Sequence, residues 1–184
     1  VARELVRGIL ILFVLLLSLF VYKITQGPFI KYLEKLSTNT NMQWDNYLVE
    51  RRVFHRLLNF VPLILIYILI PSVLAETTFL TFSLSLINAL FIILGMMTFD
   101  AFLNAVLDIY SKTTISKEIS IRPFVQVFKL VLYFVTVILL LSLILQKTPL
   151  YFLSGLGALT AVLMFVFKDV LMGFVAGIQL IANK

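Results

Sequence analysis

The side chains in this sequence that could support acid–base, nucleophilic or metal chemistry are few and widely separated. His55 is the only histidine and is set among arginines, and the chain has no cysteine to serve as a nucleophile, a thiolate ligand or a disulfide partner. A metal site normally takes three or four ligands, and no His-Glu-x-x-His motif is present. Ser154-Gly155 does not belong to a Gly-x-Ser-x-Gly motif. We therefore expect no enzyme, no metal ion and no cofactor, and we interpret His55 as an ordinary residue at a membrane interface.

Asp100 is the one acidic residue inside a long apolar run, and two interpretations of it are open. A carboxylate within a membrane segment is by default a functional candidate, here the site of a secondary transporter. Alternatively, Asp100 lies near the cytoplasmic end of its helix and bonds to a hydroxyl or a basic group of a neighbouring helix. The nearby Asp108 and Lys112 mark the water boundary and favour the second interpretation. The absence of an internal repeat also disfavours a transporter.

The composition indicates which solvent surrounds the elements that position these residues. Apolar residues make up 61% of the chain and charged residues only 13%, whereas soluble domains average about 45–50% and about 25%. Lipid is therefore the predicted solvent. The net charge of +6 does not indicate nucleic-acid binding, because the basic residues lie between the apolar runs and not in one patch.

Apolar segments of membrane-spanning length predict an all-α, polytopic protein with five transmembrane helices. A bilayer core about 30 Å thick requires roughly 20 mostly apolar residues in a helix. Four segments that we interpret as outer, tension-sensing helices meet or approach this length at residues 5–24, 57–75, 77–107 and 124–146, and the fifth lies within residues 148–184. The loop at 25–56 contains an amphipathic stretch at Phe29–Leu36. Either it rests on the lipid headgroups or it is a solvated connecting helix.

The distribution of basic residues predicts the orientation of these spans. Positive charge marks cytoplasmic loops. The first and third loops carry eight basic residues, whereas the second and fourth carry only Lys147; the eight are Lys31, Lys35, Arg51, Arg52, Arg56, Lys112, Lys117 and Arg122. This places the N-terminus outside and the C-terminus inside, against the weaker opposing signal of Arg3 and Arg7.

The last apolar stretch, residues 148–183, is too long for one straight crossing. Its 36 residues would form a helix about 54 Å long at about 1.5 Å per residue. It also contains the adjacent charges Lys168 and Asp169. Both features predict a bend near residues 168–169, with the remainder lying along the membrane surface.

Small residues are concentrated in the first half of this stretch, where Gly155, Gly157 and Ala158 would allow close helix packing. Composition alone leaves two possibilities open: tightly packed helices around a pore axis, or an ordinary packing helix in a monomeric bundle. In the first case, the apolar residues that follow could close a pore by dewetting.

Residues Leu153–Asp169, LSGLGALTAVLMFVFKD, and their continuation Gly173–Asn183, GFVAGIQLIAN, resemble the pore helix of the MscS family of mechanosensitive channels. The miniconductance branch of this family is the more similar, because it also has a basic-aromatic-His-Arg stretch before the second span, like Val53–Leu57. The resemblance implies a homoheptamer in the bacterial inner membrane, embedded in lipid, with seven pore helices and a cytoplasmic β-rich domain following the pore helix. It also implies gating by membrane tension, with release of ions and small osmolytes during hypo-osmotic shock.

The resemblance also assigns roles within the last helix. It places the pore constriction at Ala161 and Phe165, where the best-known members have leucines; a register shifted by one residue would instead give Thr160 and Met164. It makes Gly157 and Ala158 packing positions. Lys168 and Asp169 would pair between neighbouring helices at the bend, or else make contacts within their own helix or with headgroups.

Overall fold

The computed structural model describes residues 2–30, 44–74, 79–112, 116 and 120–182, and these ranges contain helices and no strand, which confirms the all-α class. The helices are α1 (Ala2–Ile24), η1 (Thr25–Phe29), α3 (Trp44–Glu50), α4 (Val53–Leu58), α5 (Phe60–Leu74), α6 (Phe79–Ser111), α7 (Arg122–Leu145) and α8 (Pro149–Ala182). The expected amphipathic stretch at 29–36 lies outside the described residues, except for its first two.

Five helical segments are long and apolar enough to cross a membrane, as predicted, so the chain is compatible with a multi-pass membrane protein. They are Leu5–Pro28, Val53–Leu74, Phe79–Ser111, Arg122–Leu145 and Pro149–Ile181. The second begins at Val53 instead of residue 57, because α4 adds an amphipathic turn before α5. The third continues to Ser111, past the expected end at residue 107.

Prolines lie at two irregular points in the described first half of the chain. Pro62 has no N–H to donate to the carbonyl of Leu58, and the helix is interrupted between α4 and α5 at Asn59. The Asn59 N–H is shared between the carbonyls of His55 and Arg56, at 3.3 and 3.2 Å, so the last turn of α4 tightens there. Pro28 acts similarly at the end of α1, where the chain widens into the π-helical turn η1.

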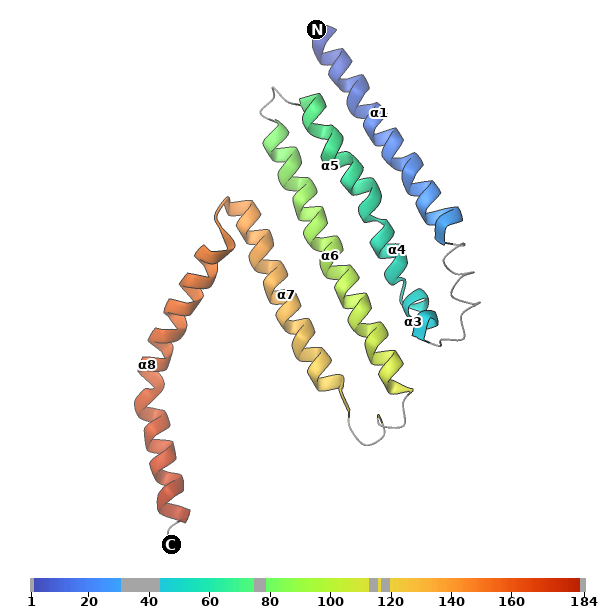
Figure 1. The fold of residues 1–184 in the computed structure, drawn as a ribbon. Coiled ribbons are helices and arrows are strands. Elements are labelled where there is room, and N and C mark those ends of the chain that lie inside the picture. Colours follow the sequence, from blue (N-terminus) through green and yellow to red (C-terminus); the bar gives the residue numbers. More distant parts are fainter. Residues whose placement is uncertain (1, 31–43, 75–78, 113–115, 117–119, 183–184) are drawn as a thin grey trace. The chain divides into compact units, whose positions relative to one another are not determined.

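The chain divides into two compact units, Val1–Ile144 and Leu145–Lys184. In the first unit, α1, α5, α6 and α7 lie side by side in that order (Figure 1). Ile70 and Leu74 of α5 pack with Ile87 of α6, and the buried hydroxyl of Ser18 on α1 donates to the Pro62 carbonyl at 3.3 Å.

A second apolar cluster packs the short helices α3 and α4 against the C-terminal half of α6. Val53 of α4 packs on Ala101 and Ala105, with Leu48 of α3 against them. Ala105 is fully buried, because its small side chain allows α4 to approach α6 closely. Among the described residues, neither apolar cluster contains a residue of α7.

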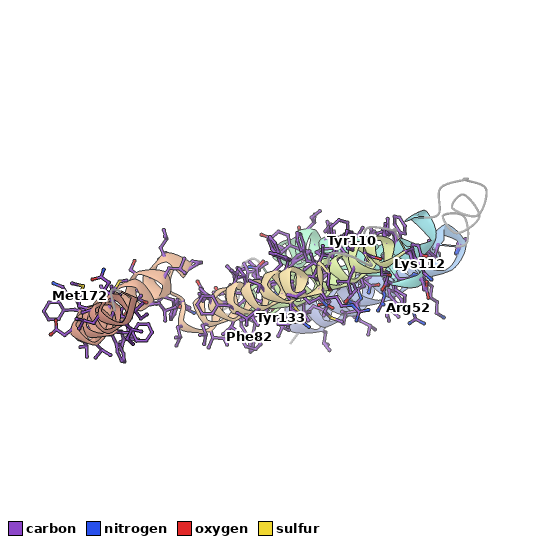
Figure 2. All side chains as sticks on the ribbon, turned by 90° about the horizontal axis from the view of Figure 1, so that it is seen from below. Arg52, Phe82, Tyr110, Lys112, Tyr133 and Met172 are labelled. Carbon is purple, nitrogen blue, oxygen red and sulfur yellow. The ribbon has the colours of Figure 1, made fainter. Side chains whose placement is uncertain are left out.

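The C-terminal ends of α1 and α6, from which the two basic loops depart, lie toward the same end of the first unit. Both helix ends are at the lower side of that unit in Figure 1. Figure 2 views that end and shows Arg52 and Lys112 there. Basic residues of the segment before α4 and of the end of α6 therefore lie at the same end of the first unit.

The second unit contains α8, a single helix through Lys168 and Asp169 that curves gently along its length (Figure 1). The described helix shows no break at these residues, and the bend there stays a prediction. At 34 residues, α8 is about 51 Å long. It therefore exceeds the apolar thickness of a bilayer by several turns.

Candidate functional site

The two sides of α8 differ in the size and polarity of their residues. At 3.6 residues per turn, positions three or four apart share a side of a helix. One side, called here the small face, carries mainly small or polar residues with a few large apolar ones: Leu150, Ser154, Gly157, Ala158, Ala161, Phe165, Lys168, Met172, Val175, Ala176 and Gln179. The opposite side carries large apolar residues and three glycines: Gly155, Leu156, Leu159, Leu163, Val166, Phe167, Val170, Gly173, Phe174, Gly177 and Ile181. The helix therefore presents two surfaces of different composition, the first the more polar.

Ala161 and Phe165 lie one turn apart on the small face and line a shallow groove of about 480 Å³. The rest of the groove is formed by Met164, Lys168, Leu171 and Met172. Phe165 is 79% exposed, so its ring has little contact with its own chain. Thr160 lies outside this lining, and its hydroxyl donates to the Leu156 carbonyl at 2.8 Å. Ala161, Phe165 and Met164 therefore line the same groove, and Thr160 does not line it. The assignment of a pore constriction stays a prediction.

The predicted packing positions have no close neighbour within the described part of the chain. A Cβ placed at Gly155 or Gly157 would meet nothing within 4 Å, and Ala158 is exposed. The other glycines are equally open, so openness alone does not distinguish these positions. Their distinguishing property is that Gly157, Ala158 and Ala161 gather on one face, where small residues permit close approach of another helix.

Lys168 and Asp169 are exposed, and neither forms an ion pair with a described residue. Charged side chains within an apolar helix are costly unless they reach water, a headgroup or a partner. For Lys168 and Asp169, the water, headgroup or partner must therefore come from outside α8.

The first unit contains a polar cluster between α6 and α7. Lys129 Nζ lies 2.8 Å from Asp100 Oδ1, and the Tyr133 hydroxyl donates to the same oxygen at 2.9 Å. Asn104 Nδ2 donates to Asp100 Oδ2 at 3.1 Å, while Lys129 Nζ donates to Asn104 Oδ1 at 2.8 Å. The side chains of Lys129 and Asp100 are only 20% and 22% exposed. Asp100 thus has a hydroxyl and a basic group as partners, as its structural interpretation expects.

This cluster was only partly visible in the sequence. Lys129, Tyr133 and Asn104 were not singled out there, although each lies in an apolar helix. The signal was their spacing: Asp100 and Asn104 are four residues apart, and so are Lys129 and Tyr133. Such pairs share a helix face and can meet a matching pair on a neighbouring helix.

A second polar contact joins the α3–α4 turn to α6. Arg51 Nη2 donates to Asp108 Oδ1 at 3.0 Å, and its Nε donates to Oδ2, which makes a bidentate pair. The hydrogen bond with Asp108 raises the pKa of the Arg51 guanidinium above its ordinary value. One turn further along, Arg56 Nη1 donates to the Met97 carbonyl. The guanidinium groups of Arg51 and Arg56 therefore both have partners on α6.

His55 lies between these arginines and takes part in the same junction through its backbone. Its carbonyl accepts a hydrogen bond from Gln26 Nε2 at 3.0 Å, and Gln26 also donates to Asn59 Oδ1. Nδ1 of His55 is buried without a partner. In the described ranges no three His, Cys, Asp or Glu side chains are grouped to hold a metal ion.

Comparison with known proteins adds no family assignment to this geometry. No protein-family model matches the chain, and no solved structure matches it either.

Proposed function

We propose that this chain is the membrane part of an ion channel that opens under bilayer tension, with α8 lining the pore. The observation that carries the proposal is the two-faced surface of α8. A single bilayer-spanning helix surrounded by lipid alone has no need of a face rich in small and polar residues. Such a face suits a helix that packs against its own copies around a water-containing axis.

The order of residues along the small face matches the needs of a gated pore. Ser154, Gly157 and Ala158 allow neighbouring helices to approach, and Ala161 and Phe165 follow one and two turns later. A ring of Phe165 side chains would present an apolar constriction that expels water, which blocks ions without a plug. Lys168, next on the same face, would then lie where the pore becomes wet again.

The opening force comes from the bilayer. Tension does work equal to itself multiplied by the change in in-plane area, so a state with a wider pore and splayed outer helices gains population as tension rises. The first unit supplies the outer helices α1, α5, α6 and α7. Its basic end faces the cytoplasm, so the N-terminus is periplasmic and the C-terminus cytoplasmic. The resemblance to the MscS family adds the heptamer, the bacterial inner membrane and the passage of ions and small osmolytes.

Patch-clamp recording in liposomes under stepped suction tests the proposal. Discrete currents whose open probability rises with suction would support it. Silence up to membrane rupture, with inserted protein demonstrated by protease protection, would rule out tension gating of this chain. Oligomer mass in the same preparation tests the heptamer separately from the current.

A further inference from the structure

The interface between α6 and α7 changes character along its length. Four polar residues recur on one side of α7 at helical spacing: Arg122, Gln126, Lys129 and Tyr133. The inner two, Lys129 and Tyr133, bind Asp100 on α6. The outer two, Arg122 and Gln126, face a part of α6 where Leu107 stands instead of an acid. Asp108, the next acid along α6, is bonded to Arg51 of the α3–α4 turn.

The outer part of this interface is hollow. Asn104, Leu107, Arg122, Val125, Gln126 and Lys129 line a cavity of about 250 Å³. A second cavity of about 270 Å³ shares Leu107 and Arg122 with it and continues past Tyr110, Ser111 and Ser120 toward the basic end. Tyr110 and Lys112 mark this end in Figure 2. Arg122 therefore lines both cavities.

The charge of the hollow is not balanced by its own walls. Among the described residues, its lining contains two cations, Arg122 and Lys129, and no carboxylate. Lys129 is neutralised from outside the lining by Asp100, but no described residue pairs with Arg122. The described walls of the hollow are therefore net positive. An arginine without an ion-pair partner among the described residues, lining a cavity near the end of an apolar helix, is suited to bind an anion.

We propose that the paired cavities between α6 and α7 bind the phosphate of an anionic phospholipid, with Arg122 as its main contact. The guanidinium can bind a phosphodiester in a bidentate manner, and the Gln126 amide can donate to a second oxygen. A zwitterionic headgroup fits less well, because its ammonium would meet two cations and no carboxylate among the described lining residues. The apolar walls at Leu107 and Val125 suit the glycerol and the upper acyl chains. This inference depends on the membrane location of the chain and not on channel activity.

Native mass spectrometry of the detergent-solubilised protein, titrated with phosphatidylglycerol or phosphatidylcholine, tests the site. Arg122→Gln should weaken binding of the first phosphatidylglycerol by about tenfold, as the loss of one charged hydrogen-bonded contact implies. Arg52→Gln is the matched control, because Arg52 is an exposed arginine at the same end that lines neither cavity. It should change the affinity by less than about twofold. Gln126→Leu leaves every charge in place and should cause a smaller loss.

Equal losses of phosphatidylglycerol affinity in the Arg122→Gln and Arg52→Gln proteins would overturn the proposal. They would mean that the lipid is attracted by the general positive charge of the surface and not by a site at Arg122. Equal binding of phosphatidylcholine and phosphatidylglycerol by the unaltered protein would also overturn it, since any phospholipid phosphate would then suffice. Circular dichroism of each variant confirms that the helices are intact. None of these measurements requires a current, so failure here leaves the channel proposal untouched, and the reverse holds equally.

Discussion

The Lys129 ammonium on α7 lies 2.8 Å from the Asp100 carboxylate on α6, within two predominantly apolar helices. In lipid, an apolar surface gains little by facing another helix instead of acyl chains, so polar contacts and close packing carry helix association. Neither cluster of buried apolar side chains in the described ranges includes α7. The Asp100–Lys129 pair, with Tyr133 and Asn104, is therefore the main specific link between α6 and α7.

Removing one partner of this pair should be more harmful than removing both. Lys129→Met leaves the Asp100 charge uncompensated and should lower the free energy of unfolding by about 1–3 kcal/mol. This is less than the 3–5 kcal/mol of a fully buried pair, because the side chains are about one-fifth exposed. Adding Asp100→Asn should restore about half of that loss or more. Thermal unfolding in detergent, arranged as a double-mutant cycle, measures these differences.

The same variants separate the channel from a transporter that uses Asp100. If Asp100 only links the helices, Asp100→Asn combined with Lys129→Met should retain tension-activated currents. A transporter would instead show saturable substrate uptake that Asp100→Asn abolishes. Uptake with that dependence, and no current, would replace the channel proposal.

The Arg51–Asp108 contact should contribute modestly and should not vary with pH near neutrality. Its side chains are 45% and 25% exposed, so we expect Arg51→Gln to cost about 0.5–1 kcal/mol, less at high salt. The raised pKa of Arg51 means that its contribution is complete below the ordinary arginine pKa and is lost only as pH rises through the still higher folded value. The cost should therefore be constant between about pH 6 and about pH 9.

Arg52→Gln provides the control for this measurement, since Arg52 is adjacent in sequence and exposed. Chemical unfolding of both variants at low and high salt gives the comparison. An equal cost in the two variants would mean that net charge matters at this turn and that the bidentate pair does not.

A large residue at Gly157 should disrupt the oligomer without harming the single chain. A Cβ there meets no atom within 4 Å, and replacing a helical glycine gains up to about 1 kcal/mol in helix propensity. Gly157→Leu should therefore leave the helix content unchanged while it weakens association at least about tenfold. Gly95→Leu on α6 is the control, because Gly95 is equally open but lies outside α8. Mass photometry measures the mass of the assembly that each protein forms. An intact oligomer in the Gly157→Leu protein would mean that the interface does not lie on the small face.

Much of this architecture follows from the sequence because lipid imposes simple rules. Uninterrupted apolar runs must be helices in a bilayer, and the five runs predicted from composition are five helices in the structure. Boundaries were less predictable where polar residues lie within a helix. Val53–Leu58 carries His55 and Arg56 yet continues the second apolar segment, and the Arg56 side chain finds a partner in the Met97 carbonyl.

Contacts between helices were harder to foresee than the helices themselves. The sequence marks Asp100 as unusual but does not identify its partner, because Lys129 lies 29 positions away and pairing depends on how α6 and α7 lie side by side. The sequence similarly does not indicate that Asp108 pairs with Arg51 and not with Arg122. The roles proposed for α8 require copies of this helix from other chains, so the assignment of Ala161 and Phe165 to a pore constriction stays a prediction.

Phe165 offers the sharpest test of the pore assignment. If its ring forms the dewetted constriction, Phe165→Ser admits water to the closed pore and should raise the open probability at low suction by at least about tenfold, the effect of about 1.4 kcal/mol. Phe165→Leu keeps an apolar ring and should gate nearly as the unaltered protein does. Phe167→Ser is the matched control: it makes the same substitution two residues away on the large apolar side of α8, where hydration of the axis is not expected. Patch-clamp thresholds for the three variants decide between the faces. A threshold lowered by Phe167→Ser and unchanged by Phe165→Ser would contradict this assignment. It would mean that the large apolar side of α8 lines the pore and forms the gate.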